Sequence, residues 1–88
     1  MKVKVFSIYD SKMEAFNQPF FMNASGAAIR AFSDMVNGDK ETNVYKHPED
    51  YTLFELGVYD DLEGKIESYD TPVSLGLGVT FKTEKVDE

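Results

Sequence analysis

The chain contains no cysteine, which excludes disulfides and any metal site built from thiolates. This absence fits a reducing cytoplasm. No segment approaches the ~20 consecutive apolar residues that a membrane-spanning helix requires. The first residues include lysines but no long apolar run after them, so we do not expect a signal peptide. We therefore expect a protein without a membrane segment.

Basic residues are few. Nine lysines and arginines stand against sixteen acidic residues, which gives a formal net charge of −7. Nucleic-acid-binding proteins usually draw much of their affinity from Lys and Arg side chains that neutralise phosphates. This chain could bind DNA only if its few basic side chains cluster, or if an oligomer aligns them. The simpler interpretation is that the acidic charge keeps a small protein soluble.

Recognisable catalytic motifs are also missing. The single histidine, His47, precedes a proline in a polar segment, and we interpret it as a loop residue without an evident catalytic partner. No serine lies in a Gly-x-Ser-x-Gly elbow, and residues 76–78 lack the features of a phosphate-binding loop. The carboxylates of residues 60–63 are expected to be solvated turn formers. We therefore expect no enzyme activity, no cofactor and no metal site.

The chain is rich in aromatic residues, with seven Phe and five Tyr among 88 residues. This length predicts a single domain over residues 1–88 with a modest core. Aromatic side chains bury a large area each, which suits such a core. Three of the six residues 83–88 are acidic, and we expect this end to be frayed.

The first third of the chain predicts strands. Lys2–Tyr9 has apolar residues on both sides, which is typical of a central or doubly covered strand. Residues 10–18 are expected to be a polar connection that could include one helical turn. Phe20–Met22 follows Pro19 as a short apolar strand, and proline is permitted at a strand start.

Asn23–Asn37 is the clearest predicted helix, because its apolar residues recur at helical spacing. The predicted buried stripe consists of Ala28, Ile29, Phe32, Met35 and Val36. Asn23 or Ser25 can cap its N-terminus, and Gly38 suits the position after its C-terminus.

The second half predicts a hairpin. After a polar loop over residues 38–50, Tyr51–Tyr59 is a long strand, and residues 60–64 are a hairpin turn ending in glycine. One side of this strand is the more uniformly apolar, and we assign that side to the core. It consists of Thr52, Phe54, Leu56 and Val58.

The return strand is expected over Lys65–Tyr69, with Ile66 facing the core. Thr71-Pro72 interrupts it, residues 76–78 permit a bend or bulge, and Val79–Lys82 is predicted to be a last strand. The whole pattern predicts an α+β fold: a small antiparallel sheet of about four to five strands with one amphipathic helix packed across one face.

A nucleic-acid-binding surface can be sought among the basic and aromatic residues. Proteins that bind single strands combine a basic groove with aromatic side chains on which bases stack. The candidate DNA-binding residues are Lys2, Lys4, Tyr9, Lys12, Arg30, Tyr45 and Lys46. Further candidate stacking rings are Phe20, Phe21, Tyr51 and Tyr59. The alternative is that most of these rings belong to the core and that the lysines protect a strand edge.

Several segments together resemble a known family. They are Lys4–Lys12 (KVFSIYDSK), Pro19–Met22 (PFFM), Ala28–Asn37 (AIRAFSDMVN), His47–Asp61 (HPEDYTLFELGVYDD) and Pro72–Gly76 (PVSLG). In this order they resemble the small nonstructural protein of gokushoviruses, single-stranded DNA phages of the Microviridae. That family is commonly labelled DNA-binding. The resemblance implies a non-enzymatic protein that binds single-stranded DNA during genome replication or the switch to single-strand synthesis. It also implies the bacterial host cytoplasm and a protein outside the virion, and it assigns no residue roles.

Two further expectations concern partners. We expect a homo-oligomer, with a dimer favoured, because symmetry doubles a small basic patch; Lys2–Tyr9 or Val79–Lys82 could pair as edge strands in it. The alternative function is a protein-interaction module that binds a viral or host replication or assembly factor without contacting DNA. The acidic charge and the aromatic content fit this alternative equally well.

Overall fold

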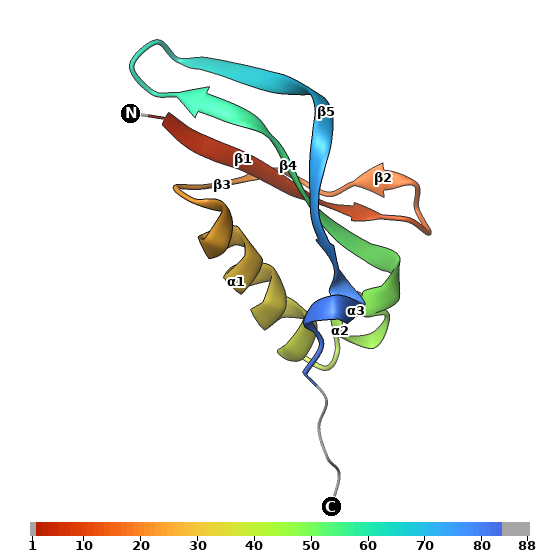
Figure 1. The fold of residues 1–88 in the computed structure, drawn as a ribbon. Coiled ribbons are helices and arrows are strands. Elements are labelled where there is room, and N and C mark those ends of the chain that lie inside the picture. Colours follow the sequence, from red (N-terminus) through yellow and green to blue (C-terminus); the bar gives the residue numbers. More distant parts are fainter. Residues whose placement is uncertain (1, 84–88) are drawn as a thin grey trace, which may run out of the picture.

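The computed structural model describes residues 2–83. Its sheet is antiparallel and five-stranded. The strands are β1 (Lys2–Asp10), β2 (Ala15–Phe16), β3 (Phe20–Met22), β4 (Tyr51–Asp60) and β5 (Lys65–Leu77). The helices are α1 (Ser25–Asn37), α2 (Asn43–Lys46), the 3-10 turn η1 (Pro48–Asp50) and α3 (Gly78–Phe81). Helix α1 crosses one side of the curled sheet (Figure 1), so the predicted α+β fold is confirmed.

Strand β1 lies in the middle of the sheet. Strand β4 pairs with its whole length, from Lys2 opposite Asp60 to Asp10 opposite Tyr51. Strands β3 and β2 share its other side, and β5 lies beyond β4. The central strand predicted over Lys2–Tyr9 is therefore confirmed. Because both sides of β1 are already paired, its expected use as an edge strand in a dimer is wrong.

The core lies between α1 and the sheet. Its buried members are Phe6, Ile8, Ala28, Phe32, Val36, Val44, Tyr51 and Leu53. The predicted helical stripe is confirmed in part, because Ile29 only borders this core and Met35 is 42% exposed. The predicted side-chain cap is wrong: Ala24 occupies the N-cap position without a side-chain hydrogen bond. The hydroxyl of Ser25 instead bonds to β4.

The face of β4 assigned to the core is the wrong one. Tyr51, Leu53 and Glu55 are buried, and Leu53 and Glu55 pair with Ile8 and Phe6 of β1. The residues assigned to the core (Thr52, Phe54, Leu56 and Val58) are only half-buried. The error arises because Glu55 makes the true core side the less apolar one in sequence, and periodicity cannot show that the fold pairs this carboxylate with Lys4, Ser25 and Tyr69.

Strand β5 also departs from expectation. Ile66 is 60% exposed and does not face the core. The strand continues through Thr71-Pro72, but its pairing with β4 is interrupted there: Ser68 lies opposite Gly57, and the next pair is Val73 with Glu55. Proline can be accommodated because this is the outer edge of the sheet.

The segment predicted as a last strand is helical. Residues 78–81 form α3, whose Gly78 lies so close to the Pro48 carbonyl that a side chain would clash with it. Phe81 then packs edge-on against Phe32 at 5.8 Å. The expected strand over Val79–Lys82, and the edge pairing proposed for it, are therefore wrong. Local sequence could not reveal this contact with a turn 30 residues earlier.

Two connections contain more structure than expected. The loop predicted over residues 38–50 includes α2, whose N-terminus is capped by the Thr42 side chain, and η1. The connection after β1 contains the short strand β2, not a helical turn. Glu14 adopts a positive φ of 57° in the tight turn before β2. The predicted frayed end over residues 83–88 lies outside the described residues apart from Thr83.

Candidate nucleic-acid interface and polar clusters

Three aromatic rings gather on the side of the sheet opposite α1. Tyr9 of β1 lies 4.9 Å from Phe16 of β2 and 6.3 Å from Phe54 of β4, measured between ring centroids. Phe16 and Phe54 are 5.5 Å apart. Strand pairing explains this outer aromatic cluster, because Tyr9 is directly opposite Phe16.

The outer aromatic cluster leaves ring surface open to a ligand. Phe16 is 44% exposed, and Tyr9 and Phe54 are half-buried. Tyr9 was among the predicted site residues, whereas Phe16 and Phe54 were missed. Phe54 had been assigned to the core, and Phe16 lay in a segment expected to be a connection. Their clustering depends on strand pairing, which the sequence pattern did not specify.

An apolar hollow lies further along the same side of β1, since Val5 and Tyr9 are four residues apart on one strand. It is lined by Val5, Pro19, Phe21, Leu56, Gly57, Ile66 and Ser68. Gly57 is required here because any side chain would clash with the Glu67 carbonyl of β5. Phe21 is 48% exposed and packs against Tyr59 at 5.8 Å. The outer side of the sheet therefore exposes apolar and aromatic groups at both ends.

The predicted basic residues do not form one surface. Lys2 is exposed at the start of β1, whereas Lys12 is exposed in the turn at its other end, beside the outer aromatic cluster. Arg30 is exposed on α1 and Lys46 on α2. Of this predicted basic set, only Lys12 lies in the turn between Tyr9 and Phe16.

Lys4 belongs to a separate polar cluster between the start of α1 and the sheet. Its ammonium donates to the Ser25 hydroxyl at 3.1 Å and lies 3.6 Å from the Glu55 carboxylate. Ser25 donates to Glu55 at 2.8 Å, and the Tyr69 hydroxyl donates to the other Glu55 oxygen. Glu55 is 7% exposed, so this polar cluster supplies the partners that a buried carboxylate needs. Lys4 is therefore engaged within the fold.

The polar cluster changes the acidity of two of its members. Burial by itself raises the pKa of Glu55, but the hydrogen bonds from Tyr69 and Ser25 and the charge of Lys4 together lower it below the ordinary value of 4.5. The hydrogen bond to Glu55 is also the largest reason why the pKa of Tyr69 is raised above 10.0. The ionised carboxylate is thus the favoured form in the folded protein.

Tyr45 is partly covered by Lys82. The Lys82 ammonium lies 3.2 Å from the centroid of the Tyr45 ring and donates to the carbonyls of Val36 and Tyr45. The Asn37 side chain also bonds to the carbonyl of Phe81 and to the amide of Thr83. These contacts join the C-terminal turn to α1 and α2. One face of the Tyr45 ring is consequently occupied by a cation and not by open solvent.

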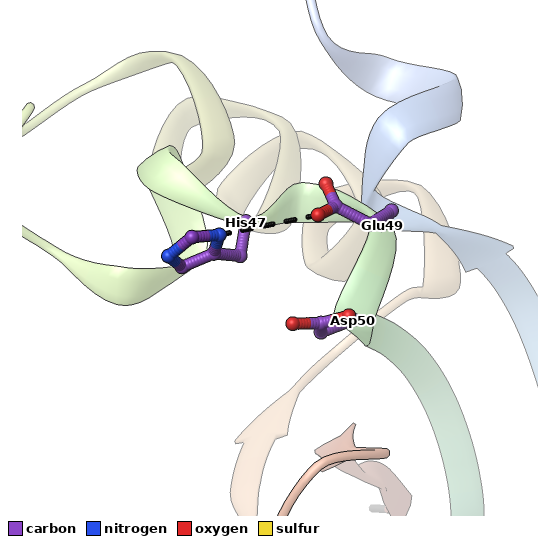
Figure 2. Close-up of side chains that lie close together, drawn as sticks. All are labelled: His47, Glu49 and Asp50. Atoms are coloured by element: carbon purple, nitrogen blue, oxygen red, sulfur yellow. Dashed lines mark ion pairs between the residues drawn. The ribbon is translucent and has the colours of Figure 1, made fainter.

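A third cluster surrounds the only histidine. His47 Nδ1 lies 3.9 Å from the Glu49 carboxylate, and Asp50 is nearby (Figure 2). One ligand atom from each of the three residues lies within 4.8 Å of the others. Nitrogen and carboxylate oxygen are ligands that divalent metal ions accept. Sequence reasoning had left His47 without a partner, although His-x-Glu-Asp spacing was visible.

Comparison with protein families indicates the origin of the chain. The model of the Phage ORF5 protein family matches residues 3–81.

The chain belongs to the Phage ORF5 protein family.

Comparison with curated proteins and with solved structures found no match. Membership of the Phage ORF5 family supports the phage origin expected from the resemblance, and the match covers every strand and helix described above except the first residue of β1. None of the helices in residues 2–83 combines the length and the apolar character of a membrane span.

Proposed function

We propose that this phage protein binds single-stranded DNA without catalysing a reaction, and that the outer aromatic cluster is its base-binding surface. The observation that carries the proposal is the contact of Tyr9, Phe16 and Phe54 on the side of the sheet opposite α1, where Phe16 is 44% exposed and the other two rings are half-buried. Every base has a face that can stack on an aromatic ring, so such a cluster binds single strands with little sequence preference.

A positively charged side chain near these rings supports a weak, salt-sensitive contact with a DNA phosphate. Lys12 is exposed in the β1–β2 turn, in the hairpin that carries Tyr9 and Phe16. The net charge of −7 opposes DNA elsewhere on the molecule. A symmetric homodimer would place two copies of Lys12 on one DNA strand. The resemblance to gokushovirus nonstructural proteins supplies the role: genome replication or the switch to single-strand synthesis, in the host cytoplasm and outside the virion.

The testing experiment is fluorescence anisotropy of a labelled single-stranded oligonucleotide titrated with the protein at low and near-physiological salt. We expect saturable binding that weakens as salt rises, because phosphate contacts release counterions. The Lys12→Ala variant should bind more weakly with a smaller salt slope, whereas Lys40→Ala, which changes an exposed lysine on the loop after α1, should not. Absence of binding at low salt would refute the proposal.

The apolar hollow favours a second candidate, an interaction module for a viral or host replication or assembly factor. The lining includes Phe21 and Ile66, which are 48% and 60% exposed, and exposed apolar surface of this kind often marks a protein contact. Binding through the hollow should be far less sensitive to salt than phosphate contact. A partner that binds normally to an Ile66→Ser variant would exclude the hollow as its site.

A further inference from the structure

We propose that His47, Glu49 and Asp50 form a binding site for a zinc-type divalent cation at the turn between α2 and β4. The site is separate from the outer aromatic cluster and does not depend on DNA binding. The three residues provide one imidazole nitrogen and two carboxylates, and their ligand atoms lie within 4.8 Å of one another.

The local backbone explains why these side chains converge. Pro48–Asp50 is a 3-10 turn, with His47 as its N-terminal cap. Residues three apart are eclipsed in such a turn, so His47 and Asp50 project to the same side. Glu49 approaches from the adjacent position, and its carboxylate is 3.9 Å from His47 Nδ1. The side chains surround one space beside the turn (Figure 2).

The turn is held in place by neighbouring elements. The His47 amide donates to the Asn43 carbonyl at 2.8 Å, and the Asp50 amide donates to the His47 carbonyl at 3.0 Å. The Ser11 amide donates to the Asp50 carbonyl at 2.9 Å. Pro48 is buried against Gly78 of α3. Cation binding would therefore require side-chain rotation only, which limits the entropy lost on binding.

The ligand chemistry favours a transition ion over magnesium or calcium. Imidazole suits Zn²⁺ and its neighbours in the periodic table, whereas Mg²⁺ and Ca²⁺ prefer sites made of oxygen alone. Within residues 2–83 no lysine or arginine forms an ion pair with Glu49 or Asp50, so no such cation competes for these carboxylates. Three protein ligands leave a fourth position for water, as in open zinc sites.

The test uses the untagged full chain, titrated calorimetrically with zinc chloride, together with proton NMR of the imidazole. Because His47 is the only histidine, its ring signals report coordination without ambiguity. We expect saturable binding of one ion per chain and a displacement of the ring signals. The His47→Ala variant should lose affinity by at least about tenfold, since even changes next to metal ligands cost about 10–100-fold.

Controls make each outcome decisive. Glu41→Gln removes an exposed carboxylate outside the cluster and should bind zinc as the wild type does. The His47 side chain is 57% exposed, so His47→Ala should fold normally, which circular dichroism would check. No heat and no NMR change would overturn the proposal. Equal zinc affinity in His47→Ala, or equal affinity of the wild type for magnesium, would also overturn it, because binding would then rest on carboxylates alone.

Discussion

The two sides of the sheet carry aromatic side chains in contrasting surroundings. On the side of α1, Phe6 and Phe32 are completely buried and pack with aliphatic residues into the core. On the outer side, Phe16 and Phe21 are 44% and 48% exposed. Both sides thus use the same residue type, but burial determines its role. Rings beneath α1 stabilise the fold, whereas exposed rings provide a surface on which another molecule can bind.

Two carboxylates, one buried and one exposed, show a similar contrast. Glu55 lies on the helix side and is satisfied by Lys4, Ser25 and Tyr69. Glu49 lies on the outside, and in the described residues its ion pair is with His47. A buried carboxylate must be paired within the fold, but an exposed one has freedom to accept an external cation. Substitutions on either side of the sheet, followed by measurements of stability and binding, test these contrasts.

The largest expected effect is on stability. Phe32→Ala should lower the free energy of unfolding by about 3–5 kcal/mol, because it leaves a cavity beneath α1. This is a large share of the ~5–15 kcal/mol that stabilises a typical domain. Urea denaturation followed by circular dichroism measures it. A loss below about 1 kcal/mol, on the scale of an ordinary surface substitution, would show that α1 does not pack as described.

A smaller effect is expected on DNA affinity. Phe16→Ala should weaken oligonucleotide binding by about 1–3 kcal/mol, which is about 5- to 150-fold in affinity, because base stacking on an aromatic ring contributes this amount. Its effect on stability should be slight, since the ring is 44% exposed. The matched control is Phe21→Ala, which removes an equally exposed ring outside the outer aromatic cluster. Equal weakening in both variants would show that the oligonucleotide does not bind specifically at the outer aromatic cluster.

The smallest effect concerns pH. Since the folded-state pKa of Glu55 is lowered from 4.5, its ionisation contributes stability above that pH, and this contribution is lost as pH falls through the folded pKa. Tyr69→Phe removes one cause of the lowering. It should reduce the free energy of unfolding at neutral pH by about 1–2 kcal/mol. The loss of stability as the pH falls should also become smaller.

Urea midpoints measured between pH 3 and 7 would compare the wild type with Tyr69→Phe. Tyr59→Phe is the control, because it removes a tyrosine hydroxyl from β4 outside the polar cluster. An identical acid profile in the wild type and Tyr69→Phe would contradict the contribution of the Tyr69–Glu55 hydrogen bond.

Much of the secondary structure could be predicted because it depends on local pattern. The helical spacing of Ala28, Phe32 and Val36 identified α1, and alternation identified β1 and β4. The candidate site was harder to predict from the sequence. Tyr9 was predicted as a DNA-binding residue, but its partners Phe16 and Phe54 were not, because their proximity arises from the pairing of three strands. Lys4 was selected for its charge, although the fold engages that charge with Glu55.

The amino-acid sequence alone specifies the order of most elements, the acidic charge, the absence of disulfides and the placement of His47, Glu49 and Asp50 within one short segment. Only contacts between distant segments explain which side of β4 forms the core, why Gly78–Phe81 is a helix, and which charges are already paired. The difference arises from the distance along the chain over which each kind of interaction acts. Periodicity and turn preferences act over a few residues, whereas burial and pairing depend on contacts between residues far apart in the chain.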